Sequence, residues 1–133
     1  MRLNHSHRLL PAAKIFLALS LCGGIVAGIS ADGAPVTEAE KIEYLVGSIE
    51  RLTHAKFIRN GIEYDAQAAA DHLRLKWRNA GSRVKTAEDF IQLCASASSV
   101  SGRPYRIRFA DGSVMESAAF FREKLNSLSD RKN

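Results

Sequence analysis

Apolar residues recur at helical spacing along much of the chain beyond residue 37, and they predict four helices. Each predicted helix follows a residue whose side chain can accept hydrogen bonds from free backbone amides. Thr37 and Glu40 have the spacing of a capping box, in which two side chains satisfy each other's backbone amides. The predicted helices span 38–53 after Thr37, 66–79 after Asp65, a segment after Thr86, and a segment that Ser117 caps.

Two short segments show the turn signals and alternation of β-structure. Residues 57–64 contain Asn60-Gly61, the strongest short signal for a tight hairpin. Because the flanks of this turn are short, we expect a two-stranded ribbon at most. Residues 104–109 alternate between apolar and basic side chains, and Asp111-Gly112 provides a turn into a return strand. The sequence therefore predicts a small, mostly helical α+β domain with about four helices and one or two short β-hairpins.

The first thirty-one residues have the order of a secretory signal peptide. Three basic residues and no acidic residue precede Asp32, and 15–29 is a predominantly apolar run that ends in small residues. We expect cleavage near Ala31, which would place 32–133 in the periplasm as one domain with a frayed C-terminal end and no membrane span. The alternative is an uncleaved membrane anchor, although the run is shorter than the roughly 18–20 residues that a spanning helix needs.

Removal of this segment changes the charge of the protein. The net charge falls from +5 to +2, because three basic residues leave and no acidic residue does. The remaining charge does not indicate a nucleic-acid partner. The 46% of hydrophobic residues exclude global disorder, and two cysteines exclude a disulfide-dense scaffold. Cys94 lies on an apolar helical stripe and is expected to be buried, the alternative being a thiol nucleophile beside His72.

A serine-rich segment near residue 100 is a candidate binding loop. Its hydroxyls, a glycine and nearby positive charge suit a carboxylate, a phosphate or a sugar. The alternative is a loop whose hydroxyls satisfy its own backbone. The candidate residues are Ser96, Ser98, Ser99, Ser101, Gly102, Arg103 and Tyr105.

Two further sets of side chains are candidates for binding. His72 and Lys76 lie one turn apart on the flank of the second helix, where the lysine lowers the pKa of the histidine and offers a cation to an anionic ligand. Arg59, Asn60 and Tyr64 belong to the hairpin, whose tip is expected to stand out from the body as a contact surface. The alternatives are an amphipathic helix flank and a solvated turn.

Four motifs lie in a characteristic order: FIRNG at 57–61, HLRLK at 72–76, TAEDFI at 86–91 and SASSVSGRPY at 96–105. In this order they resemble the YfeK-like family of small exported bacterial proteins, over about 41–128. The resemblance implies a single exported domain of unknown function, located in the periplasm. It implies no catalytic residues.

Together these features predict a non-catalytic exported module. It would bind a small anionic or polar ligand, or an envelope protein, through the serine-rich loop, the adjacent basic strand and the hairpin tip. The alternative is a small envelope hydrolase or transferase in which His72 acts on a loop serine, and this requires a hydroxyl within about 3.2 Å of the histidine. The two histidines of the mature part, His54 and His72, lack the paired spacing of a metal site, so we expect no metal and no cofactor.

Overall fold

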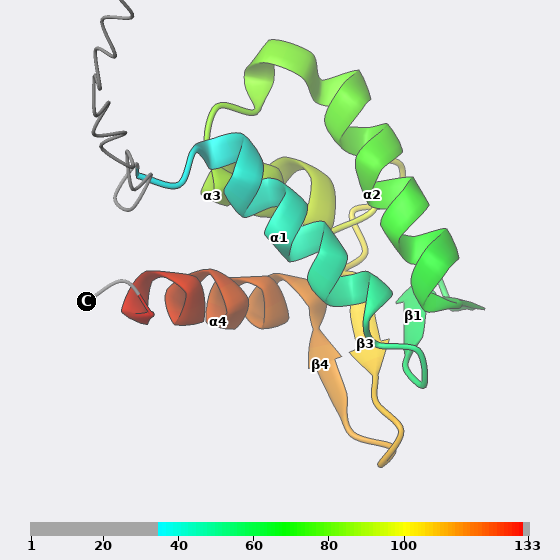
Figure 1. Ribbon diagram of the computed structural model, residues 1–133. Coiled ribbons are helices and arrows are strands. Elements are labelled where there is room, and N and C mark those ends of the chain that lie inside the picture. Colours follow the sequence, from blue (N-terminus) through cyan, green and yellow to red (C-terminus); the bar gives the residue numbers. More distant parts are fainter. Residues whose placement is uncertain (1–34, 132–133) are drawn as a thin grey trace, which may run out of the picture. The chain divides into compact units, whose positions relative to one another are not determined.

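The computed structural model describes residues 35–131, and the predicted signal peptide lies outside that range. The described residues belong to one compact unit, 34–133. Within it, four α-helices accompany a four-stranded antiparallel sheet (Figure 1), which confirms the α+β prediction. None of the helices in this part of the chain has the length and apolarity to cross a membrane.

The helices begin where the sequence predicts. Thr37 and Glu40 form the capping box, and the Asp65 carboxylate accepts from the Ala68 amide at 2.8 Å. The second helix ends at Gly81, whose φ of 54° favours a residue without a side chain. The helical elements are α1 (Glu38–Glu50), α2 (Ala66–Ala80), a short 3-10 turn (Gly81–Arg83), α3 (Ala87–Phe90), a π-helical turn η2 (Ile91–Ala95) and α4 (Ser117–Asp130).

The prediction that Ser117 caps the last helix is wrong. Glu116 occupies the cap position, without a side-chain hydrogen bond, and Ser117 is the first helical residue. The backbone amide of Ser117 donates to the carbonyl oxygen of Tyr105 at 2.9 Å. The reason is that a strand leads directly into α4, so the residue before the helix is already fixed by the sheet.

The two hairpins join into one sheet. The strands β1 (Lys56–Arg59), β2 (Ile62–Tyr64), β3 (Arg106–Arg108) and β4 (Val114–Glu116) lie in the order β2-β1-β3-β4. In the central pair, Phe57 lies opposite Ile107. The prediction of a two-stranded ribbon is therefore wrong, because the second edge of β1 pairs with β3. Three or more strands with an apolar face are what such short strands need for stability.

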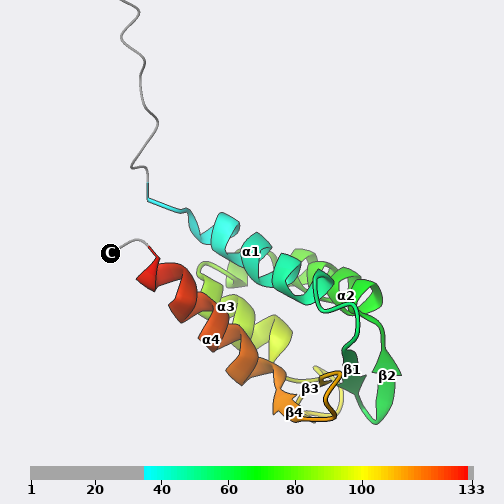
Figure 2. The ribbon, with the colours of Figure 1, turned by 60° about the horizontal axis from the view of Figure 1, so that its bottom comes forward.

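One face of the sheet packs on the helices and the other meets solvent. Phe57 and Ile107 are buried, whereas Arg106 and Arg108 on either side of Ile107 are exposed. Figures 1 and 2 show α1 and α2 side by side, with the sheet at one end of the helices. The core between these layers is apolar, and its largest fully buried side chains are Phe90, Phe121, Leu45, Ile49, Ile91, Ile107, Val46 and Cys94.

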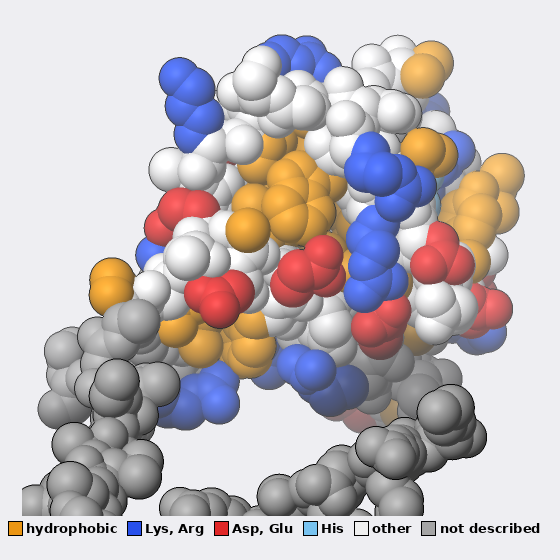
Figure 3. Space-filling model, turned by 45° about the horizontal axis from the view of Figure 1, so that its top comes forward, with side chains coloured by type: hydrophobic (Ala, Val, Ile, Leu, Met, Phe, Trp, Pro, Cys, Tyr) orange, Lys and Arg blue, Asp and Glu red, His pale blue; other side chains and the backbone are white. Residues whose placement is uncertain are grey.

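Ion pairs join α1 and α2 on the helical side of the domain. Figure 3 shows basic and acidic side chains next to one another around a central apolar patch. Arg74 on α2 forms ion pairs with Glu50 at 2.6 Å and with Glu43 at 3.8 Å, both on α1. These pairs cross the contact between the two helices, so they help to fix α2, which carries His72.

Candidate functional site

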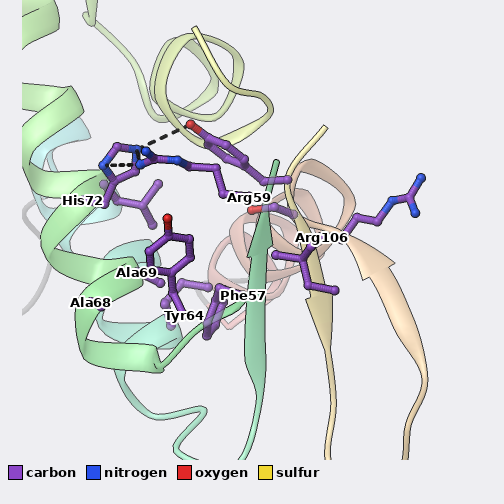
Figure 4. A pocket seen from close by; sticks show the side chains of 12 residues that line it. Phe57, Arg59, Tyr64, Ala68, Ala69, His72 and Arg106 are labelled. Carbon is purple, nitrogen blue, oxygen red and sulfur yellow. Dashed lines mark hydrogen bonds between the residues drawn. The ribbon is translucent and has the colours of Figure 1, made fainter. Parts of the chain in front are cut away.

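A cleft of about 210 Å³ opens between α2, the end of α1 and the sheet (Figure 4). It lies next to the first turns of α2, where small alanine side chains leave space between the helix and β1. A half-open cleft with an apolar wall and a few polar groups is the usual form of a small-molecule site. The apolar side chains that line it are Ile49, Phe57, Ile58, Ala68, Ala69 and Leu73.

The side chains of Arg59 and Tyr64 belong to this cleft and do not stand out from the body. Both residues are half-buried, and the Arg59 guanidinium lies over the Tyr64 ring, 5.6 Å from its centroid. The prediction of a protruding contact surface is thus wrong for these two residues. Side chains alternate along a strand, so Arg59 lies on the same, helix-facing side of β1 as the buried Phe57. Of the three candidate residues of the hairpin, only Asn60, at the turn, is exposed.

Four side chains form what we term the basic cluster: Arg59, His72, Lys76 and Tyr105. One guanidinium nitrogen of Arg59 lies 3.1 Å from Nδ1 and 3.0 Å from Nε2 of His72. The Tyr105 hydroxyl lies 3.5 Å from Nε2 of His72 and 3.4 Å from Nζ of Lys76. The cluster joins α2 to the end of β1 and to the residue before β3, and Arg59, His72 and Tyr105 also line the cleft.

Lys76 is held in place by Ala97 and Tyr105, which lie in the chain between η2 and β3. Its Nζ donates to the backbone carbonyl of Ala97 at 2.9 Å and lies 5.0 Å from the centroid of the Tyr105 ring. Burial lowers the pKa of Lys76, and the nearby Arg59 lowers it further. An ammonium group has three N–H donors, and Lys76 uses two of them on the Ala97 carbonyl and the Tyr105 hydroxyl, which leaves one for another acceptor.

The basic cluster favours a neutral His72. Burial lowers the pKa of His72, and the positive charges of Arg59 and Lys76 lower it further. Because a guanidinium group only donates, a ring nitrogen of His72 has to accept from Arg59, which a protonated imidazole cannot do. Burial raises the pKa of the Tyr105 phenol, which therefore stays protonated.

The positive charge at the cleft is not balanced by an acidic side chain. Figure 4 shows side chains of twelve residues around the cleft, and among these described residues none is an aspartate or a glutamate. Figure 4 also shows the guanidinium group of Arg106 directed away from the cleft. An anion in the cleft would therefore meet Arg59, with Lys76 behind it, and no competing carboxylate.

The serine-rich loop uses its hydroxyls mainly for its own fold. The Ser96 hydroxyl donates to the carbonyl of Ile91 at 2.7 Å, and Ser98 is buried. The Ser101 hydroxyl donates to the Asn60 side chain at 2.6 Å, which ties the loop to the first hairpin. These bonds favour the structural alternative for Ser96, Ser98 and Ser101.

The rest of the loop is open to solvent. Ser99 and Arg103 are exposed, as is Gly102, which has a φ of 69° and donates its amide to the carbonyl of Ser98 at 2.8 Å. The structure thus brings the loop, the basic strand and Asn60 of the hairpin together, as the sequence predicts. Ligand binding by the loop, the strand and Asn60 stays a prediction.

A catalytic pair of His72 and a serine has no support in the geometry. In the described part of the chain, no hydrogen bond joins His72 to a serine hydroxyl, and the hydroxyl that reaches it is that of Tyr105. Cys94 is buried, and burial raises the pKa of its thiol, so it has the character of a core residue. Within 35–131, no three histidine, cysteine or acidic side chains lie close enough together to hold a metal ion.

The apolar part of the cleft was not foreseen from the sequence. Its walls come from α1, α2 and both hairpins, and only the pairing of β1 with β3 brings these together. One local signal was available, because Arg59 is two residues from Phe57 and must share its face of the strand. An arginine on the buried face of a strand indicates a polar site beneath it.

Comparison with known proteins places the chain in a family. The model of a family of unknown function, DUF5329, matches residues 36–129. The chain belongs to this family. It is also 38% identical over 68 residues to the uncharacterized protein YfeK of Salmonella typhimurium, and the match covers 51% of this chain and 57% of that protein. The matched part of the chain thus spans little more than half the length of this relative. The similarity agrees with the resemblance to the YfeK-like family. No solved structure matches the chain.

Proposed function

We propose that this domain is a non-catalytic binding module, exported to the periplasm, that holds a small organic acid in the cleft. The observation that carries the proposal is the basic cluster at an apolar cleft that no carboxylate lines among the described residues. The carboxylate of the ligand would accept from Arg59, and its apolar body would contact Phe57 and Leu73. Charge-assisted hydrogen bonds of this kind are about twice as strong as neutral ones.

The size of the cleft limits the ligand. A cavity of about 150 Å³ holds a benzene molecule, so the cleft of about 210 Å³ has room for one ring or a chain of roughly six carbons. Benzoate and hexanoate therefore represent the expected ligand class. The serine-rich loop is the main binding candidate from the sequence. In this proposal its role is structural, because it holds the hairpin and Ala97 in position.

Export is supported by the order of basic, apolar and small residues in 1–31. It is also supported by the family resemblance, since YfeK-like proteins are small exported proteins. An extracytoplasmic binding module has access to small organic acids that diffuse into the cell envelope. Fractionation of cells that express the full chain tests this part of the proposal, because a cleaved periplasmic product is expected and a cytoplasmic full-length product would contradict it.

Titration calorimetry tests the binding. We expect the purified protein to bind hexanoate and not the neutral analogue hexanol, because the guanidinium group of Arg59 distinguishes them. Substitution Arg59→Gln removes a charged donor and is expected to weaken hexanoate binding about 10- to 100-fold. The matched control is Arg78→Gln, an exposed position on α2, which removes the same charge and should leave the affinity unchanged.

Two results would refute the proposed function. One is equal binding of hexanol and hexanoate, because the basic cluster would then have no part in recognition. The other is the same loss of affinity in Arg59→Gln and Arg78→Gln, because the effect would then follow the net charge of the protein.

A further inference from the structure

The solvent-facing side of the sheet contains a second depression. This outer hollow, of about 420 Å³, is lined by Ile58, Asn60, Gly61, Arg103, Pro104 and Arg106. Its residues come from β1, the turn that follows it, the segment that leads into β3, and the first residue of β3. Ile58 and Arg106 also line the cleft, but the guanidinium group of Arg106 points away from it (Figure 4).

Both arginines of the outer hollow lack an acidic partner. In the part of the chain that the structure describes, neither Arg103 nor Arg106 forms an ion pair. Glu116 lies opposite Arg106 in the register of β3 and β4, yet these two side chains are not bonded. On the same face, Glu63 is already engaged by Arg108 at 2.6 Å.

The surroundings of the two arginines increase the positive charge of this face. Lys56 lies directly opposite Arg108 in the register of β1 and β3. Like charges in facing positions of a sheet repel each other, although Glu63 partly offsets Arg108 here. Glu63 and Glu116 are two acidic residues beside the four cations Lys56, Arg103, Arg106 and Arg108, so positive charge is in excess around the outer hollow.

The arrangement of donors favours a phosphate over a carboxylate. A carboxylate has two oxygens, and one guanidinium fork satisfies both of them. Two guanidinium groups at one hollow match an anion with more oxygens and a larger charge, such as a phosphate group. Ile58 and Pro104 provide apolar surface beside the arginines, which suits the carbon part of a phosphate ester.

We propose that the outer hollow binds the phosphate group of an ester through Arg103 and Arg106, at a site that adjoins the cleft and shares Ile58 and Arg106 with its lining. The phosphate comes either from a free ester such as glycerol 3-phosphate or from the headgroup of an anionic phospholipid. Both present the same chemistry to the two arginines. This proposal does not depend on the proposed function, since Arg103 does not line the cleft and no residue of the basic cluster lines the outer hollow.

The test uses two probes. The first is glycerol 3-phosphate, titrated into ¹⁵N-labelled protein while amide resonances of Gly61, Arg103 and Arg106 are followed. The second is cosedimentation with vesicles of phosphatidylglycerol and phosphatidylcholine in equal parts, compared with vesicles of phosphatidylcholine alone. The variant Arg103→Gln/Arg106→Gln is expected to lose at least about 10-fold in affinity for whichever probe binds.

The matched control is Arg78→Gln/Arg83→Gln, which removes the same charge at the C-terminal end of α2 and in the 3-10 turn that follows it. All four positions are exposed, so both variants should keep the unfolding temperature of the wild type. Saturable shifts with glycerol 3-phosphate support the site with a free ester as its ligand. Binding to the anionic vesicles alone supports the site with a phospholipid headgroup as its ligand.

Absence of binding to both probes would overturn the proposal, and so would an equal loss in the two double variants. The Arg59→Gln variant separates this outcome from a failure of the proposed function. It should bind the phosphate probe as the wild type does, whatever its affinity for hexanoate.

Discussion

His72 lies in a half-buried position with two cations beside it, and its ring accepts from one of them. A protonated imidazole would lose the hydrogen bond from Arg59 and would add a third positive charge to the basic cluster. Folding therefore favours the neutral ring. The same reasoning explains how a bound anion would help the protein, since it restores a balance of charge that the folded domain lacks at this point.

The stability of the domain should therefore depend on the protonation of His72. The unfolded chain takes up a proton at His72 near the ordinary pKa of about 6.5, whereas the folded domain does so only at lower pH. Because the unfolded state binds more protons there, stability falls as the pH decreases through 6.5. We predict that His72→Asn reduces this fall between about pH 7 and about pH 5.5, as measured by urea unfolding.

The matched control for this prediction is His54→Asn. His54 is exposed and lies outside the basic cluster, so His54→Asn controls for the exchange of a histidine for an asparagine as such. The expectation for His72 would be contradicted if His72→Asn and the wild type lost stability equally over this range. The lowered pKa values of Glu38 and Asp89 affect stability only at more acidic pH.

Among the elements, α2 matters most for the cleft because it positions His72 and Lys76. Its first turn is fixed by the Asp65 side chain, which accepts from the Ala68 amide, and its middle is fixed by the Arg74 ion pairs to α1. We predict that Asp65→Ala destabilises the domain by about 1 kcal/mol through the loss of this cap.

The test is chemical unfolding of Asp65→Ala beside Asp65→Asn. Asparagine also caps helices well, so Asp65→Asn should keep most of the stability. If both variants lost the same amount, the charge of Asp65 would be the cause and the capping role would be wrong.

The elements themselves were largely predictable, because they depend on neighbours in the chain. The capping box of Thr37, the cap of Asp65 and the Asn60-Gly61 turn each fix a boundary locally. The structure differs from the prediction where tertiary contacts determine the end of an element or its pairing. Ser117 is not a cap because a strand continues directly into α4, and the first hairpin is not an isolated ribbon because β1 also pairs with β3.

The candidate site was predictable only in part, for the same reason. The residue types make His72, Lys76 and Tyr105 candidates. The hairpin pattern predicts that Arg59 lies at a protruding tip. Their meeting in one cluster depends on the packing of α2 against the sheet, which no local pattern of the sequence encodes. The serine-rich loop was attractive for its hydroxyls, yet bonds to Ile91 and Asn60 already engage two of them.

At the scale of the whole molecule, one aromatic contact chain connects the helices. Phe90 is fully buried, and its ring meets Trp77 of α2 at 6.0 Å and Phe121 of α4 at 6.2 Å between centroids. We predict that Phe121→Ala destabilises the domain by about 3–5 kcal/mol, because it leaves a cavity in this core. Since a domain has only about 5–15 kcal/mol of stability, much of it would be lost.

Trp77 is the single tryptophan of the chain, so its fluorescence follows unfolding directly. Leu128→Ala, at a half-buried position of α4, is the control and should cost much less. A loss below about 1 kcal/mol for Phe121→Ala would show that this core is not packed as described.

We propose above that the cleft, with its basic cluster, binds a small organic acid. The most direct measurement is a titration of ¹⁵N-labelled protein with hexanoate, followed by NMR. We expect saturable shifts of the amides of Arg59, Tyr64, His72 and Tyr105, with α4 beyond Phe121 unaffected. Shifts confined to other parts of the molecule, or none at all, would contradict it.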